Sequence, residues 1–206
     1  MKRSLTFALL ALSIITLSAQ HGHNMQPGGR HQNCENSHRY PRQTYFISGN
    51  AVYFNGKKVA DATPNGFISL SFGYAKDPWN VFFNGTKVKG ASSDTFTSLG
   101  DGYGKDAWNV YLWGQKIKGA SPDSFSVMPF GYAKDTWKVY YGGSAIKGAS
   151  TDSFRVLADG YAADNWNVYF DGKRIDGASP DSFTVYPDGY ASDNWNTYYW
   201  GRRMDR

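Results

Sequence analysis

The sequence predicts an all-β fold made of stacked antiparallel hairpins, and three observations support it. A segment of the form Gly-Tyr-(Ala/Gly)-x-Asp-x-Trp-x-(Val/Thr)-(Tyr/Phe) occurs five times, with 29 residues from each copy to the next. Each copy ends in β-branched and aromatic residues, and the turn after it has glycine in second place. Strict spacing without insertions is typical of one unit stacked on its neighbours. We therefore expect an open, solenoid-like array, with a small β-propeller as the alternative.

Residues 1–19 have the layout of a secretory signal peptide. Lys2 and Arg3 form a basic start, a run rich in Leu, Ile, Phe and Ala follows, and small residues end the segment. The apolar run is shorter than the roughly 20 residues that span a bilayer, so we expect no transmembrane segment here or later in the chain. We expect an exported protein that is periplasmic, on the cell surface or extracellular.

Residues 20–43 differ in composition and are expected to form a disordered leader. All four histidines of the chain lie there, His21, His23, His31 and His38, together with its one cysteine, Cys34. Imidazole and thiolate can bind zinc or copper, but their spacing matches no closed structural zinc pattern. We therefore expect a solvated linker and no metal site or cofactor, and a single cysteine permits no internal disulfide.

The first clear hairpin spans residues 79–88. Asn84-Gly85 predicts a type I′ turn, which needs two positive φ angles, and glycine holds the second position in every copy. A two-residue turn pairs Phe83 with Thr86 and Val81 with Val88. Period-two alternation then places the equivalents of Trp79, Val81, Phe83 and Val88 on a core face and those of Asn80, Phe82 and Lys87 on an outer face.

The predicted outer face carries one aromatic residue per hairpin. Phe82 is followed in later copies by four tyrosines, Tyr111, Tyr140, Tyr169 and Tyr198. A row of tyrosines beside Lys and Arg side chains is a candidate site for a glycan or polymer partner. The same pattern also fits a half-buried outer face covered by Lys and Arg stems, and we favour this structural interpretation.

The recurring tryptophans are Trp79, Trp108, Trp137, Trp166 and Trp195. Of these, Trp108, Trp137 and Trp166 are predicted to lie between adjacent repeats and to hold them together. On this interpretation, replacing Trp137 by Ala costs roughly 3–5 kcal/mol of stability.

Two further tryptophans, Trp113 and Trp200, stand at hairpin tips where other copies have Asn, Asp or Gly. A tip residue must accept a positive φ angle, which is costly for a bulky aromatic residue. Both are therefore candidate contacts for a partner or glycan. The alternative is that each covers a neighbouring loop, and Trp200 then helps to cap the array.

The repeat domain is predicted to span residues 44–206, with six hairpins and five connectors. Tyr45, Val52 and Phe67 match residues of the next copy, one period later in the chain. The first copy lacks counterparts of Trp79 and Asp77, and such a degenerate copy is expected of a cap. In the connectors, Ser-Pro-Asp-Ser predicts a capped helical turn, and the following phenylalanine starts a short strand. Those phenylalanines are Phe96, Phe125, Phe154 and Phe183.

Charge and residue types exclude several function classes. The chain has a net charge of +5, but from Thr44 onward 17 Lys and Arg residues are balanced by 16 Asp residues. Without a basic stripe, we expect no nucleic-acid partner. The repeats contain no His, Cys or Glu, which leaves Asp, Tyr and Lys for acid–base chemistry. Recurring Asp residues are more typical of turns, and a calcium site would need several more oxygen ligands.

The repeats resemble the bacterial DKNYY family. The resemblance rests on Tyr74-Ala75-Lys76-Asp77 and Tyr132-Ala133-Lys134-Asp135, each followed by Val, two aromatic residues and then glycine. This chain departs from the family signature where Lys-Asn after Asp becomes Pro-Trp, Ala-Trp, Thr-Trp or Asn-Trp. The resemblance covers nearly all of residues 44–204. It implies a repeat array and supplies no catalytic residues.

The function that these observations favour is a non-enzymatic binding or structural module of the bacterial cell envelope or exterior. We expect a protein or polysaccharide partner and a monomeric chain. The alternatives are a carbohydrate-active hydrolase, which needs two unequal carboxylates about 5–10 Å apart, and a calcium-binding repeat protein.

Overall fold

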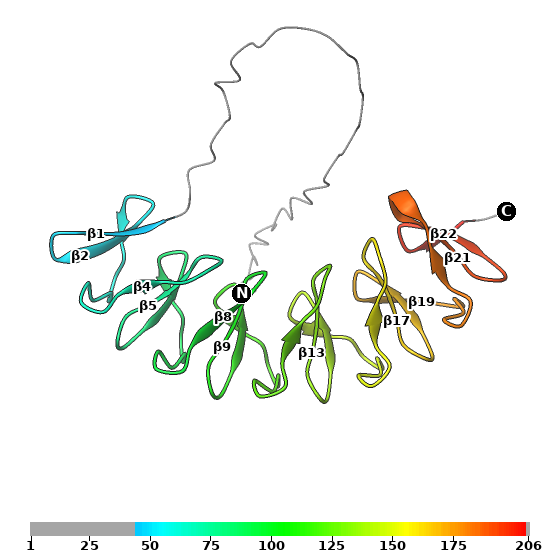
Figure 1. Ribbon diagram of the computed structural model, residues 1–206, viewed down its shortest axis with the longest axis horizontal. Helices are drawn as coiled ribbons and strands as arrows, with labels where there is room; N and C mark the ends of the chain where they lie inside the picture. Colours follow the sequence, from blue (N-terminus) through cyan, green and yellow to red (C-terminus); the bar gives the residue numbers. More distant parts are fainter. Residues whose placement is uncertain (1–43, 205–206) are drawn as a thin grey trace, which may run out of the picture. The chain divides into compact units, whose positions relative to one another are not determined.

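The computed structural model describes residues 44–204, and the expected signal peptide and leader lie outside the described residues. The described part is all-β, and its one helical segment is a three-residue 3₁₀ turn, η1 Pro187–Gly189. Within residues 44–204, no helix has the length and apolar character needed to cross a membrane. The strands form six separate antiparallel sheets that follow one another in chain order (Figure 1).

Each sheet is a meander in which consecutive strands pair. The first sheet has three strands, β1 Tyr45–Ser48, β2 Ala51–Phe54 and β3 Lys57–Lys58. The second has β4 Ile68–Ser69, β5 Tyr74–Lys76, β6 Val81–Phe83 and β7 Thr86–Lys87. The third has β8 Thr97–Gly100, β9 Tyr103–Lys105, β10 Val110–Leu112 and β11 Gln115–Lys116.

The remaining three sheets repeat this order. The fourth has β12 Ser126–Val127, β13 Tyr132–Lys134, β14 Val139–Tyr141 and β15 Ser144–Ala145. The fifth has β16 Arg155–Val156, β17 Tyr161–Ala163, β18 Val168–Phe170 and β19 Lys173–Ile175. The sixth has β20 Thr184–Val185, β21 Tyr190–Ser192, β22 Thr197–Tyr199 and β23 Arg202–Arg203.

The predicted hairpin turns are confirmed. Asn84 and Gly85 have φ angles of 47° and 77°, and the equivalent pairs in the other sheets are also positive at both positions. The register is as predicted, with Phe83 opposite Thr86 and the Val88 amide bonded to the Val81 carbonyl. Two positive φ angles are what a type I′ turn requires, so the local sequence determines each hairpin.

The connectors contribute more to the sheets than the sequence predicted. The strand after each connector phenylalanine pairs with the next repeat, as Ile68 and Ser69 do with Lys76 and Ala75, so five sheets have four strands. Within residues 44–204, each Ser-Pro-Asp-Ser segment forms a turn that is not extended into a helix. The strands are only two to four residues long, so a four-stranded sheet fits into a repeat of 29 residues.

The hydrophobic core is divided into five clusters, each formed by two successive sheets. In one of them Tyr103, Val110 and Leu112 of the third sheet pack with Ala133 and Tyr140 of the fourth. The other four clusters are built from equivalent positions of the other sheet pairs. Each inner sheet therefore has two buried faces, a forward face toward the next sheet and a backward face toward the preceding one.

The connector phenylalanine fills the space between two sheets. Phe125 lies 5.5 Å from Tyr103 on one side and 5.6 Å from Tyr140 on the other, measured between ring centroids. A small residue on the backward face makes room for it. A Cβ atom added to Gly104, for example, would lie 2.5 Å from the Phe96 ring.

A second tyrosine in each repeat fastens one sheet to the next. The Tyr74 hydroxyl donates to the Gly102 carbonyl and accepts a hydrogen bond from the Gly114 amide, both at 3.0 Å and both in the following repeat. Tyr45, Tyr132 and Tyr161 bond in the same way. Tyr103 faces the Gly143 amide without a well-formed hydrogen bond. We call these five residues the clamp tyrosines.

The array is open, as predicted, and is not closed into a barrel. Tyr190 of the sixth sheet stands at the clamp position but is 47% exposed, whereas the clamp tyrosines from Tyr74 to Tyr161 are at most 1% exposed. Phe46 of the first sheet is similarly exposed. The first and last sheets therefore each keep one uncovered face within residues 44–204.

Candidate functional site

The aspartates of the repeat form closed hydrogen-bond networks. One carboxylate oxygen of Asp135 accepts from the Trp137 and Lys138 amides at 2.7 and 2.8 Å. The other accepts from the Ser121 amide and the Tyr140 hydroxyl, both at 2.8 Å. Asp106, Asp164 and Asp193 have the same four kinds of donor. These carboxylates therefore cap a turn and join it to the preceding connector.

The network shifts the pKa of both partners. Burial alone would raise the pKa of the Asp135 carboxyl, but the hydrogen bonds from Ser121, Tyr140, Trp137 and Lys138 outweigh it and lower the pKa. Burial, together with donation to the ionised carboxylate, raises the pKa of the Tyr140 hydroxyl. The same two causes raise the pKa of Tyr198 to about 12. At neutral pH the network therefore consists of an ionised Asp and a neutral Tyr.

The tyrosines predicted to form an outer row do not lie on the surface. Tyr111, Tyr140, Tyr169 and Tyr198 are at most 1% exposed. They lie on the backward face, against the preceding sheet, where the connector phenylalanine covers the ring and the Asp carboxylate accepts a hydrogen bond from the hydroxyl. We call them the inner tyrosines. Their rings cannot contact a partner in this fold, which corrects the prediction of a single core face.

The recurring tryptophans are exposed, so the prediction that they lie between repeats is wrong. Trp79, Trp108, Trp137, Trp166 and Trp195 are 72–78% exposed. Alternation failed here because the tryptophan lies in the Asp-capped turn before the strand, as at Asp77–Asn80 between β5 and β6, and not in the strand. We call these five residues the tryptophan column.

The residue that follows each tryptophan of the column is polar and, in four of the five repeats, uncharged. Asn follows the tryptophan at Asn80, Asn109, Asn167 and Asn196, and Lys138 takes this place once. In the last two repeats Asn165 and Asn194 precede it and are exposed. Each repeat therefore offers one flat apolar ring beside polar groups, most of them amides that can donate and accept hydrogen bonds.

Trp113 and Trp200 lie in hairpin turns at the end of the sheet opposite to the tryptophan column, and they are 53% and 46% exposed. Their φ angles of 49° and 45° confirm the strained conformation. Each ring lies against the glycine of the adjacent turn, since a Cβ atom on Gly102 would be 2.1 Å from Trp113 and one on Gly189 would be 2.3 Å from Trp200. These contacts support the interpretation that each covers a neighbouring loop.

Two residues of the same kind were missed in the sequence. Phe72 and Phe130 have φ angles of 55° and 57° and are also about half exposed. Each stands directly before the glycine of the turn that joins the first two strands of its sheet, at the same end of the sheet as the hairpin tip. The remaining full copies have Asp at this position. The available signal was the same as for Trp113, a bulky aromatic residue directly before a turn glycine.

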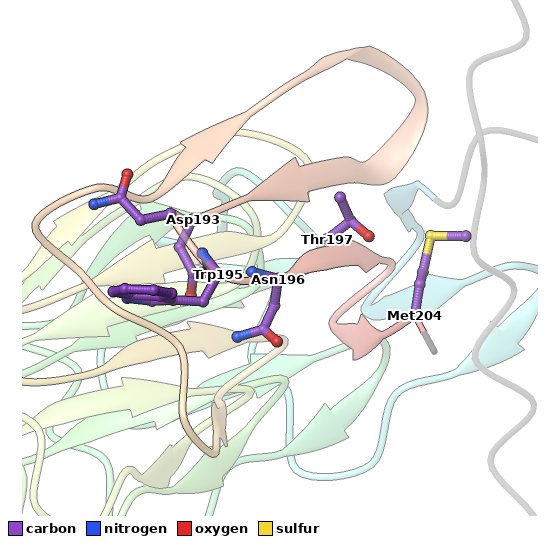
Figure 2. Close-up of a pocket in the computed structure, with 6 residues that line it drawn as sticks. Asp193, Trp195, Asn196, Thr197 and Met204 are labelled. Atoms are coloured by element: carbon purple, nitrogen blue, oxygen red, sulfur yellow. Dashed lines mark hydrogen bonds between the residues drawn. The ribbon is translucent and has the colours of Figure 1, made fainter. Parts of the chain in front are cut away.

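The last sheet carries an open hollow lined by Asp193, Asn194, Trp195, Asn196, Thr197 and Met204. Figure 2 shows the Trp195 ring directed away from Thr197 and Met204. The single carboxylate in this lining is Asp193. Desolvation would raise its pKa, but hydrogen bonds from Ser179, Trp195, Tyr198 and Asn196 outweigh that effect and lower it. An ionised, fully bonded carboxylate suits a cap better than a general acid, which needs a raised pKa.

Comparison with known proteins identifies the repeats. The model of the DKNYY family matches residues 45–161 and, in an overlapping match, residues 74–202. No curated protein and no solved structure matches the chain.

Proposed function

Because the chain belongs to the DKNYY family, whose defining feature is the repeat itself, we propose that it is a non-enzymatic binding module whose ligand site is the tryptophan column. One observation carries this proposal: five large apolar side chains are 72–78% exposed at equivalent positions of successive repeats. Burying such a side chain is favourable, so its repeated exposure indicates a binding surface.

The ligand class that fits this surface is a polysaccharide. A pyranose ring has an apolar face that stacks on an aromatic ring and hydroxyl groups that bond to amides, and each repeat pairs Trp with Asn or Lys. A polymer with a regular repeat can contact several equivalent sites at once, which raises its overall affinity without stronger single contacts. The near balance of Lys and Arg with Asp does not favour a strongly charged polymer.

The place of action that we propose is the cell envelope or the exterior. The basic and apolar segment at residues 1–19 supports export, and it lies outside the described residues. Neither the hydrolase nor the calcium alternative gains support from the recurring aspartates. Their oxygens accept from amide and hydroxyl donors that a cation or substrate would have to displace.

The test is titration of purified envelope polysaccharides into the full chain, with tryptophan fluorescence and calorimetry as readouts. Trp108→Ala with Trp137→Ala should weaken binding on the order of tenfold or more, because neighbouring sites act together. Trp113→Asn is the matched control, because Trp113 lies at the end of the sheet opposite to the tryptophan column. This variant should bind like the parent. Equal binding by the double variant, or no binding of any polysaccharide by the parent, would contradict the proposal.

A further inference from the structure

We infer that the two ends of the array form complementary halves of one inter-repeat interface, so that the forward face of the sixth sheet binds the backward face of the first sheet in a second copy of this chain. The sequence alone led us to expect a monomer. The inference concerns the end sheets and does not depend on the tryptophan column.

The sixth sheet presents an unused forward face. Tyr190 stands at the clamp position and its ring packs on Tyr199 at 4.7 Å, as Tyr74 packs on Phe83, but Tyr190 and Tyr199 are nearly half exposed. No following repeat within residues 44–204 receives its hydroxyl. Met204 is equally exposed where Val88 and its counterpart Ile117 are buried in the inner repeats. An end sheet that served only as a cap would favour polar residues here.

The first sheet presents an open turn glycine on its backward face. In later repeats the tip glycine approaches the preceding sheet, since a Cβ atom on Gly85 would lie 3.0 Å from Phe54 and one on Gly201 would lie 2.5 Å from Phe170. Among residues 44–204, nothing lies within 4 Å of that position at Gly56. Within this part of the chain, the tip of the first hairpin therefore has no neighbour in the place of a preceding repeat, and a sheet of a second copy fits there.

This turn also carries the backbone groups that a clamp tyrosine binds. Tyr45 donates to the Gly73 carbonyl and accepts from the Gly85 amide of the second sheet. One period earlier, the same two positions are Thr44 and Gly56. The clamp residue in the sixth sheet of a second copy would therefore donate to the carbonyl of Thr44 and accept from the amide of Gly56.

The first sheet also supplies the ring that a connector supplies elsewhere. Inner repeats have Ala or Gly at the position of Ala75, which leaves room for the connector phenylalanine, but the first repeat has Phe46 there. Phe46 stacks on Tyr53 with centroids 5.2 Å apart and an interplanar angle of 12°. Phe46 therefore takes the place of the connector ring between Tyr53 and an incoming Tyr190, and the joint needs no covalent connector.

Such an interface is heterologous, because two different surfaces meet, and it leaves one free end of each kind in every dimer. Each free end can bind a further copy in the same way. The inference therefore predicts open head-to-tail chains whose average length rises with protein concentration.

The test is sedimentation velocity of the full chain from about 1 μM to 1 mM, the range in which a weak interface is populated. The parent should shift to dimers and longer species as concentration rises. Tyr190→Glu at one end and Phe46→Glu at the other should each weaken association on the order of tenfold or more, because each buries a charge in the joint. Lys147→Glu, at an exposed position of an inner repeat, is the matched control and should associate like the parent.

Mixing the two end variants gives the sharpest outcome. Each variant keeps one intact end, so the mixture should form a dimer with the affinity of the parent, at a concentration at which each variant alone stays mostly monomeric. A parent that stays monomeric at every concentration would overturn the inference. So would end variants that associate like the parent, or a mixture that forms no dimer while both variants retain the parent circular dichroism spectrum.

Discussion

The inner tyrosines and the tryptophan column repeat with the same period and stand three residues apart, yet they have opposite environments. Tyr140 is fully buried, whereas Trp137 is 77% exposed. Tyr140 lies in β14 against the preceding sheet, and Trp137 lies in the turn that Asp135 caps. An aromatic residue that recurs in every repeat is therefore not necessarily part of the core, and its place on a strand or a turn decides its burial.

The same aspartate determines both environments. Asp135 accepts a hydrogen bond from the Tyr140 hydroxyl, which makes burial of that polar group favourable. It also accepts from the Trp137 amide, which fixes the turn and leaves the indole outside. The comparison therefore predicts that changes at the aspartate and the tyrosines affect stability, whereas changes at the tryptophans affect binding.

The largest expected effect comes from acidification, because four carboxylates titrate together. Despite desolvation, which would raise them, the pKa values of Asp106, Asp135, Asp164 and Asp193 are lowered in the folded chain by hydrogen bonds. Their contribution is complete above the unfolded pKa of about 4 and is lost as pH falls through the lower folded values. The urea midpoint should therefore stay level from about pH 7 to 5 and fall below about pH 4. A midpoint that is unchanged at about pH 2 would show that these carboxylates do not stabilise the fold.

A single substitution at the aspartate is expected to have the next largest effect. Asp135→Asn keeps the size of the side chain but turns an NH₂ group either toward the Ser121 amide and the Tyr140 hydroxyl or toward the Trp137 and Lys138 amides, so these groups lose their acceptor. We expect a loss of about 3 kcal/mol in the free energy of unfolding, measured by urea titration. The exposed Asp152→Asn is the matched control and should change stability by less than about 0.5 kcal/mol.

The clamp tyrosines allow a comparison between an inner repeat and the end of the array. Tyr132→Phe removes the hydroxyl that bonds to Gly160 and Gly172, leaving a carbonyl and an amide without this partner. We expect a loss of about 1–3 kcal/mol. Tyr190→Phe removes the equivalent hydroxyl from the exposed end and should be neutral at low protein concentration. Equal losses in the two variants would show that the clamp contributes nothing specific to the inner repeats.

The smallest effect on stability is expected at the tryptophan column. Trp137→Ala removes a side chain that is already 77% exposed in the folded chain. Because folding buries little of its apolar surface, its removal costs little stability. We expect a change of about 0.5 kcal/mol or less, in place of the roughly 3–5 kcal/mol that the sequence alone predicted. A thermal melt of the variant beside the parent measures this. A large loss would mean that the indole packs on a neighbour in solution.

The hairpins and their order were predictable from the sequence, and the candidate site was predictable only in part. Asn84-Gly85 and its counterparts specify the turn type and register through local backbone preferences. Trp113 could be identified because a bulky residue at a positive φ angle is unusual. The exposure of Trp137 could not, because alternation applies within strands and its turn is defined by Asp135.

The period, the hairpin turns and the open repeat array can be inferred from the sequence, since they depend on residues close together in the chain. Which aromatic residues are buried depends on the packing of one sheet on the next. Burial of Tyr140 depends on Phe125 and Tyr103, which lie in the preceding connector and sheet, and on how closely the two sheets approach. Alternation within one strand identifies its two faces, but it cannot show that a neighbour covers both of them.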